Sequence, residues 1–199
     1  MNDGISTTEG FIDYCIDQRA NKKSFLLDVD CLIDWKPIER LLTNQYKKRQ
    51  AADGRPAYPP LTLFKMLLIQ RWYNLSDPGL EEAVNDRLSF PRFTGFSFES
   101  SIPDETTIYR FRNELTQKGL YKKLLGRINA QLEAHNILVS KTRNRLISRL
   151  RYTVEQGFGT LKRRYRFDRA RYLGILKIEM EFYLNAMAFN LRKAAAMLA

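Results

Sequence analysis

The chain has 199 residues and a formal net charge of +11, and 44% apolar with 12% aromatic residues is enough to bury the core of one domain. No apolar run approaches the length of a membrane span, and the first residues lack the order of a secretory signal, so we expect a cytoplasmic protein. Cys15 and Cys31 are too few and too isolated for a disulfide framework or a zinc site. The single histidine, His135, argues against histidine-based catalysis.

The positive charge is concentrated in residues 141–171, which hold 11 basic and 2 acidic side chains and therefore a net charge of +9. Such a local excess of cations favours binding to a polyanion. One carboxylate, Glu155, lies inside this basic segment between Arg151 and Lys162, where it can meet a metal ion beside a phosphate.

The first half of the chain has helical periodicity. We expect a short amphipathic helix over 35–46, with Asp34 as a candidate cap and Pro37 in the first turn. Residues 47–60 contain one glycine and three prolines and should form a loop. Residues 61–74 are apolar nearly all round, which is typical of a central core helix.

Three more helices are expected before residue 140. The first starts at Ser76 or Asp77 and is ended by Pro91 and Gly95. Its apolar stripe consists of Leu80, Val84 and Leu88. The second is capped by Asp104 and has the sequence ETTIYRFRNEL. The third follows Gly119, and its apolar residues recur at steps of four: Leu120, Leu124, Ile128 and Leu132.

The C-terminal third continues the helical pattern. A stripe over 147–161 predicts one helix, on whose flank Arg151, Glu155 and Lys162 lie, and 175–198 forms a last long helix. The only strand-like stretch, 24–33, is too short and solitary for a sheet of any size. We therefore expect an all-α fold, with a multi-helical N-terminal domain over 1–139 and two long helices in 140–199.

Several blocks of sequence carry a family resemblance. They are IDW at 33–35, GRPAYPPLTLFKMLLIQRWYNLSD at 54–77, LSFPRFTGFS at 88–97, IPDETTIYRFRNEL at 102–115 and RYTVEQGFGTLKRRYRFDRARYLG at 151–174. The first four resemble the N-terminal domain of InsH-like bacterial insertion-sequence transposases, and the last resembles the end of their catalytic domain. In that family a Tyr, two residues, an Arg, three residues, the catalytic Glu, six residues and a Lys form a helix motif. Arg151, Glu155 and Lys162 match this spacing, and Ser148 stands in place of the Tyr.

The resemblance also implies two catalytic aspartates on an RNase H-like sheet, which this chain lacks. The sheet would lie near residues 138–142, but no strand-patterned run and no Asp or Glu occurs from Asn136 to Val154. We infer an internal deletion that joined the N-terminal domain to the Glu-bearing tail, 140–199. The last two helices normally pack on the missing sheet, so their apolar faces need another partner: the N-terminal helices, each other, or a second copy.

Catalysis in the intact family uses Mg²⁺, and in-line displacement at phosphorus uses two metals held by several carboxylates. Glu155 alone is then a relic of the metal site, and we expect no bound cofactor. Asp28 and Asp30 form a DxD, but the resemblance places them outside the catalytic domain. Asp104 and Glu105 are interpreted as a helix cap and a first-turn charge.

DNA contact is the activity that can remain. The expected phosphate contacts in the basic segment are Arg143, Arg145, Arg149, Lys162, Arg163, Arg164, Arg166, Arg169 and Arg171. A second candidate is the TTIYRFR helix, acting as a recognition helix through Thr106, Thr107, Tyr109, Arg110 and Arg112. The plain alternative for both is a solvated charged face.

Three functions are therefore open. The chain is a transposase-derived, catalytically incomplete protein that binds double-stranded DNA at element ends, alone, as a homo-oligomer or with an intact transposase. Alternatively it is an active DDE transposase whose acids come from elsewhere, or a helical interaction module without a role on nucleic acid. The first function implies a bacterial, nucleoid-associated protein.

Overall fold

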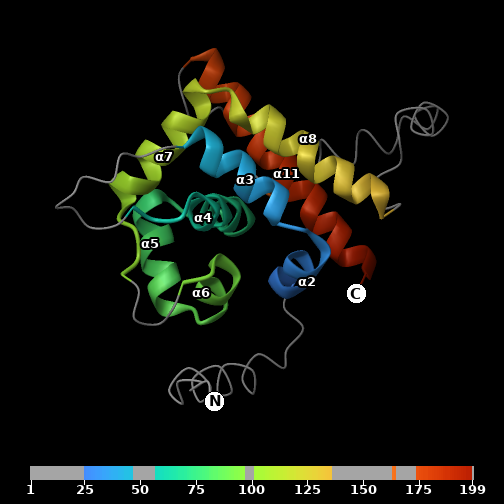
Figure 1. The fold of residues 1–199 in the computed structure, drawn as a ribbon. Helices are drawn as coiled ribbons and strands as arrows, with labels where there is room; N and C mark the ends of the chain where they lie inside the picture. Colours follow the sequence, from blue (N-terminus) through green and yellow to red (C-terminus); the bar gives the residue numbers. More distant parts are fainter. Residues whose placement is uncertain (1–24, 47–56, 97–100, 136–162, 165–173, 199) are drawn as a thin grey trace, which may run out of the picture.

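The computed structural model describes residues 25–46, 57–96, 101–135, 163–164 and 174–198, and all regular secondary structure within these ranges is helical. The fold is all-α, as the sequence predicts. The helices are α2 (Phe25–Leu32), α3 (Lys36–Gln45), α4 (Pro60–Tyr73), α5 (Asp77–Asp86), α6 (Ser89–Thr94), α7 (Glu105–Gln117), α8 (Leu120–Ala134) and α11 (Ile175–Leu198) (Figure 1). None of these described helices is both long enough and apolar enough to cross a membrane.

Helix α4 is the centre of the core, and Figure 1 shows it nearly end-on with the other helices around it. Residues 62–72 are all buried, and α4 contacts α3, α5, α6, α7 and α11. Each fully buried Leu or Phe side chain stabilises the fold by about 1.5 to 3 kcal/mol. The prediction of a central core helix over 61–74 is confirmed, with its start one residue earlier at Pro60 and its end at Tyr73.

Helix α5 begins where the sequence predicts and ends earlier. The Ser76 hydroxyl oxygen accepts a hydrogen bond from the Gly79 backbone N–H at 3.1 Å, which caps the helix. Leu80 and Val84 are buried, but Leu88 is 37% exposed because α5 ends at Asp86 and the chain turns into the separate helix α6. The prediction that Leu88 completes the stripe of this helix is therefore wrong.

The stretch 24–33, which has the residue pattern of a strand, contains the helix α2 over Phe25–Leu32. The interpretation of this stretch as strand-like is therefore wrong. The buried residues of α2 are Leu26, Val29 and Leu32, spaced by three, so one helical face is covered. Helix α2 contacts α6 and α11, and this tertiary packing overrides the alternation of apolar residues with Asp28 and Asp30.

Helices α7 and α8 begin at the cap and the turn that the sequence predicts. The Asp104 carboxylate caps α7 by accepting the Thr107 backbone N–H at 2.8 Å. Gly119 adopts φ of 60°, a left-handed conformation that favours glycine, and turns the chain into α8. The predicted stripe of α8 from Leu120 to Leu132 is buried, which confirms it.

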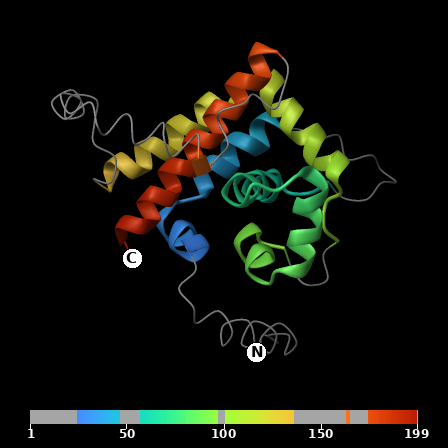
Figure 2. The same cartoon turned by 180° about the vertical axis from the view of Figure 1, so that it is seen from behind.

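Helix α11 packs against the N-terminal helices. Of the three partners considered for the apolar face of the last helix, the structure therefore shows the first. Helix α11 contacts α2, α4, α7 and α8, and both ribbon views show it lying alongside α8 (Figures 1 and 2). The buried Arg71 and Glu181 form an ion pair at 3.2 Å, and Trp72 Nε1 donates a hydrogen bond to the Ala188 carbonyl at 2.8 Å. One continuous hydrophobic core therefore includes both the N-terminal helices and α11.

Candidate nucleic-acid interface

Most of the predicted basic segment lies outside the described residues. This applies to the motif residues Arg151, Glu155 and Lys162, and to the DNA-contact candidates Arg143, Arg145, Arg149, Arg166, Arg169 and Arg171. Within the segment, Arg163 and Arg164 are described, and the side chains of both are exposed.

Arg164 lies at the C-terminal end of the core helix α4. Asn74, the C-cap of α4, has φ of 53°, and its side-chain amide donates a hydrogen bond to the Arg164 carbonyl at 2.8 Å. Asn tolerates this left-handed conformation better than most residues. The backbone of Arg164 is thereby held at the C-terminal end of α4, where the helix dipole is negative, and its side chain is exposed from this point.

The N-terminal half of α7 presents only part of the predicted recognition surface. Tyr109 is 46% exposed and Arg110 is exposed, so both are accessible. The Thr106 hydroxyl donates to the Asp104 carboxylate at 2.8 Å, and the Thr107 backbone N–H binds the same carboxylate. Hydrogen bonds from Thr107 and Thr106 hold the pKa of Asp104 below its ordinary value, so a negative charge remains at this helix end.

Arg112 is not part of an accessible surface, which corrects its assignment as a DNA contact. Its side chain is 1% exposed, and its guanidinium donates to both carboxylate oxygens of Asp77 and to Gln70 Oε1. Gln70 Nε2 also donates to Asp77 Oδ1 at 2.6 Å. Burial raises the pKa of Asp77, but the hydrogen bonds and charge of Arg112 outweigh this effect and leave the pKa below its ordinary value.

An open cleft of about 640 Å³ beside the start of α7 is acidic. Its lining includes Glu81 and Glu82 of α5 together with Asp104 and Glu105. Glu81 Oε2 accepts the Glu105 backbone N–H at 3.1 Å, so part of this charge caps α7 from the neighbouring helix. Four carboxylates next to Thr106 make this end of α7 unfavourable for a DNA phosphate.

The carboxylates of the described residues do not fit a two-metal site. No group of three His, Cys, Asp or Glu side chains in the described part of the chain could hold a metal ion. Asp28 and Asp30 lie two residues apart on α2, about 200° apart around the helix, and Asp30 is paired with Lys65 Nζ at 2.6 Å. Among the described acids, Asp104 caps α7 and Asp77 pairs with Arg112.

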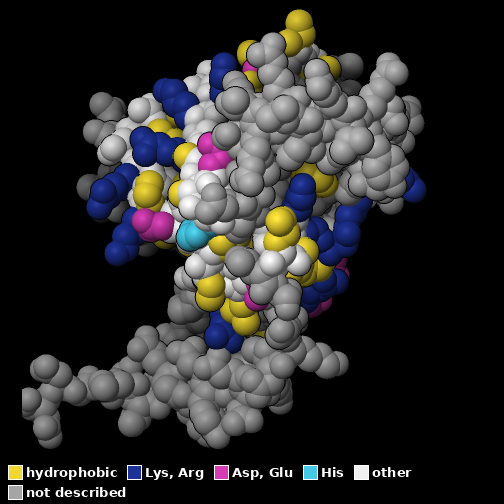
Figure 3. All heavy atoms as spheres, turned by 90° about the vertical axis from the view of Figure 1, so that its right-hand side faces the viewer, with side chains coloured by type: hydrophobic (Ala, Val, Ile, Leu, Met, Phe, Trp, Pro, Cys, Tyr) yellow, Lys and Arg dark blue, Asp and Glu magenta, His cyan; other side chains and the backbone are white. Residues whose placement is uncertain are grey.

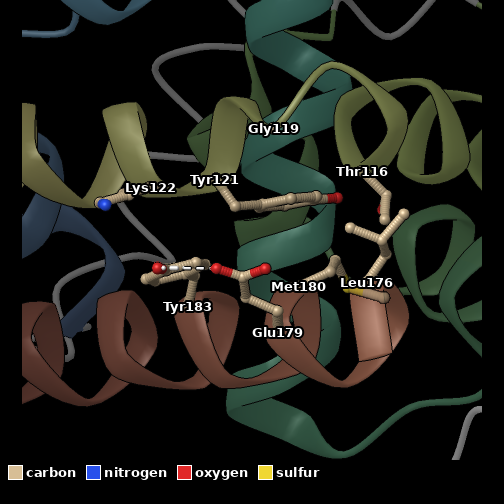
Figure 4. A pocket seen from close by; sticks show the side chains of 8 residues that line it. All are labelled: Thr116, Gly119, Tyr121, Lys122, Leu176, Glu179, Met180 and Tyr183. Atoms are coloured by element: carbon tan, nitrogen blue, oxygen red, sulfur yellow. Dashed lines mark hydrogen bonds between the residues drawn. The ribbon is translucent and has the colours of Figure 1, made fainter. Parts of the chain in front are cut away.

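A second cavity, of about 200 Å³, lies where α11 passes the junction of α7 and α8. Figure 4 shows Tyr121 and Tyr183 facing it from opposite helices, with Leu176 and Met180 at one side. The Tyr183 hydroxyl donates to Glu179 at 3.0 Å, and this hydrogen bond raises the pKa of Tyr183. The lining has one carboxylate and one lysine. We interpret this cavity as a gap in the packing between helices, because it lacks the several carboxylates that phosphoryl transfer with metal ions needs.

The structure also presents exposed cations that the sequence analysis did not select. Four of them are Lys36 and Arg40 on α3 and Lys123 and Arg127 on α8. Helical spacing places each pair on one face of its own helix, but only the structure shows that α3 and α8 are neighbours.

Two family models match the chain and together cover nearly all of it. A transposase domain (DUF772) matches residues 14–114, just over half of the chain, and a transposase DDE domain matches residues 113–195. No solved structure matches. Intact DDE transposases act on DNA with divalent metal ions, as the sequence resemblance implies. The chain therefore belongs to the DUF772 transposase-domain family and is an insertion-sequence DDE transposase-like protein.

Proposed function

We propose that this protein binds double-stranded DNA of its insertion sequence and does not cleave it. The observation that carries the proposal is the attachment of the basic segment to the core at one described point, where the Asn74 side-chain amide donates to the Arg164 carbonyl. Because the backbone is already held at this point, bringing the exposed arginines to a phosphate costs less backbone entropy. Arg163 and Arg164 are exposed at this point, and the remaining cations of 141–171 are close to them in sequence.

The catalytic part of the proposal depends on a shortage of carboxylates. Two metals need several carboxylate ligands, and the stretch from Asn136 to Val154 has no Asp or Glu. The described acids near the core are already used for caps and ion pairs. We take 1–139 as the N-terminal domain and 140–199 as the remnant of the catalytic domain, with Glu155 as the last acid of the trio. Mg²⁺ is then a cofactor of intact relatives only.

The second candidate function is an active transposase that obtains its missing acids from another chain. A partner transposase at the same DNA end would be required, so this function implies a hetero-oligomer. Self-association of the present chain would not suffice, because each copy contributes the same incomplete set. The DDE-domain match over 113–195, which includes Glu155, is the observation that favours keeping this candidate.

A titration of the full chain with labelled duplexes tests the binding. We expect binding that weakens steeply with salt, by about 0.9 log units in affinity per log unit of salt for each phosphate contacted. A duplex carrying the element end and one of unrelated sequence should be compared at the same salt concentration. Affinity no better than that of a neutral protein of similar size would reject the proposal and leave a helical interaction module.

Incubation of the same duplex with Mg²⁺ or Mn²⁺ tests the lack of cleavage. We expect no nicked product from the protein alone. Metal-dependent nicking that disappears in Glu155→Gln would establish the second candidate. Binding should be nearly equal in Glu155→Gln and in the natural sequence, whereas reversal of charge at Arg163, Arg164 and Arg166 should weaken it.

A further inference from the structure

Helices α3 and α8 lie antiparallel and are tied together at both ends. At one end, the Asp34 backbone N–H donates to Gln131 Oε1 at 2.8 Å, and Gln131 Nε2 donates to the Asp34 carbonyl at 2.9 Å. At the other end, Lys118 Nζ donates to the Gln45 carbonyl. Residue 34 is thus opposite 131 and residue 45 is opposite 118. With this alignment fixed, the angle of 100° per residue tells which side chains lie near the contact between the two helices.

On α8, one side faces α3 and the other faces α11. Gln131 marks the side facing α3, and Asn129, which accepts a hydrogen bond from Asn190 of α11 at 2.9 Å, marks the other. At about 100° per residue, Arg127 lies about 40° and Lys123 about 80° from Gln131. Lys122 lies about 20° from Asn129, on the opposite side of α8.

On α3, the side facing α4 is marked by Trp35, whose ring lies 4.5 Å from Lys65 Nζ. The half-buried Leu41 lies about 120° from Trp35 around α3 and about 20° from Asp34, the residue bonded to Gln131, so we take it to mark the side facing α8. Arg40 lies about 100° and Lys36 about 140° from Leu41 around α3, so both point to solvent beside α8 and not into the line of contact. Because the helices are antiparallel, Arg40 lies at the same height along the helix axes as the turn of α8 from Lys123 to Arg127.

The resulting surface, called here the α3–α8 seam, consists of Lys36, Arg40, Lys123 and Arg127. All four side chains are exposed, and none has an ion-pair partner among the described residues. Glu133 lies about 20° from Lys122, on the side of α8 away from Gln131. Glu39 lies about 60° from Lys36 around α3 and borders the seam, which keeps a net positive charge. Asp34, at one end, accepts the Lys36 backbone N–H at 3.0 Å. Figure 3 shows the face of the molecule that carries the histidine, where Lys and Arg side chains are more numerous than the Asp and Glu side chains among them.

We propose that the α3–α8 seam is a second contact surface for the phosphate backbone of duplex DNA, separate from the basic segment 141–171. This inference rests on the proposed function, since it assigns a further surface to the same ligand. Cations one helical turn apart on two packed helices stand about 6 Å apart along each axis. Such a rigid row can neutralise successive phosphates and release their counterions. Contacts of this kind position a protein on DNA without reading its sequence.

The test uses the full-length chain and a duplex of arbitrary sequence, because phosphate contacts do not depend on base identity. Lys123→Gln and Lys122→Gln are a matched pair: adjacent lysines on one helix, both exposed, with the same change in charge. The dissociation constant of each variant is measured over a range of salt. Lys123→Gln should flatten the slope of log affinity against log salt by about 0.9, and Lys122→Gln should leave it unchanged.

The triple variant Arg40→Gln, Lys123→Gln and Arg127→Gln should flatten the slope by about 2.7. Circular dichroism and urea unfolding confirm that each variant is folded, which is expected for exposed side chains. Equal slopes for Lys122→Gln and Lys123→Gln, with normal binding by the natural sequence, would reject the seam as a DNA contact surface. The proposed function would still stand. A natural sequence that binds no duplex at all would overturn both.

Discussion

At the scale of single residues, Arg112 shows how a charged side chain in a DNA-binding pattern can belong to the core. It lies on the same face of α7 as the buried Ile108 and Leu115, so it points inward although Arg110, two residues earlier, points to solvent. Its charge is compensated by Asp77 and by Gln70, both from the α4–α5 region. The ion pair between Arg112 and Asp77 therefore joins α7 to α5 inside the molecule.

The Asp77 carboxylate should make the stability of the protein depend on pH. Its pKa in the folded state is below the ordinary value of 3.8, so its contribution is complete above about pH 4 and is lost as the pH falls through the folded-state pKa. Asp77→Asn should lower the free energy of unfolding at pH 7 by about 1.5 to 3 kcal/mol, the usual value of a charged hydrogen bond.

Urea unfolding of both proteins between pH 7 and pH 2.5 is the measurement. The difference between natural sequence and Asp77→Asn should shrink with acidification, because Asp77 itself becomes neutral. The cap residue Asp104 titrates in the same range, but it is present in both proteins and cancels. A difference that stays constant over the whole pH range would show that Asp77 does not act through its charge.

At the scale of secondary-structure elements, most helices could be predicted because their signals are local. Caps such as Ser76 and Asp104, and turns such as Gly119, are read directly from the sequence. The exceptions are decided by distant contacts. In α2, apolar residues alternate with Asp28 and Asp30, and only the covering by α6 and α11 selects a helix. Leu88 is exposed because α6 supplies Phe90 and Phe93 to the core in its place.

The docking of α11 on the N-terminal helices is another such contact, and a matched pair of leucines tests it. Leu184 is fully buried, whereas Leu176, on the same helix, is 62% exposed. Leu184→Ala should lower the free energy of unfolding by about 2 to 5 kcal/mol, because it removes buried apolar atoms and leaves a cavity. Leu176→Ala should change it by less than about 0.5 kcal/mol.

Urea titrations followed by far-ultraviolet circular dichroism give both values. Unfolding should remain a single transition in both variants, since α11 belongs to the same core as the N-terminal helices. Equal small effects of the two substitutions would mean that α11 does not pack on this core in solution.

At the scale of the whole molecule, charge is unevenly distributed, and this organisation could be predicted only in part. The basic segment is visible in the sequence as a local run. The acidic cleft is not, because Glu81 and Glu82 of α5 meet Asp104 and Glu105 only in the folded chain. The α3–α8 seam is hidden for the same reason, since its two pairs of cations are more than 80 residues apart in sequence.

This uneven charge leads to a comparison of two arginines that are both exposed. Arg110 lies on α7, whose start is bordered by the four carboxylates of the acidic cleft, and Arg164 lies at the end of α4, where Asn74 holds its backbone. A duplex phosphate near Arg110 is repelled by the cleft, whereas Arg164 is next to the exposed Arg163 and belongs to a sequence segment of net charge +9. Arg164→Gln should therefore weaken duplex binding more than Arg110→Gln does, although each removes one positive charge.

Dissociation constants at two salt concentrations are sufficient to separate the two variants. We expect Arg164→Gln to flatten the salt dependence by about 0.9 log units per log unit of salt and Arg110→Gln to leave it nearly unchanged. The opposite order would assign the contact to α7 as a recognition helix, since its exposed Tyr109 and Arg110 would then reach the DNA past the cleft. Raising the salt should reduce the difference between the variants, because screening weakens both the repulsion by the cleft and the attraction by the arginine.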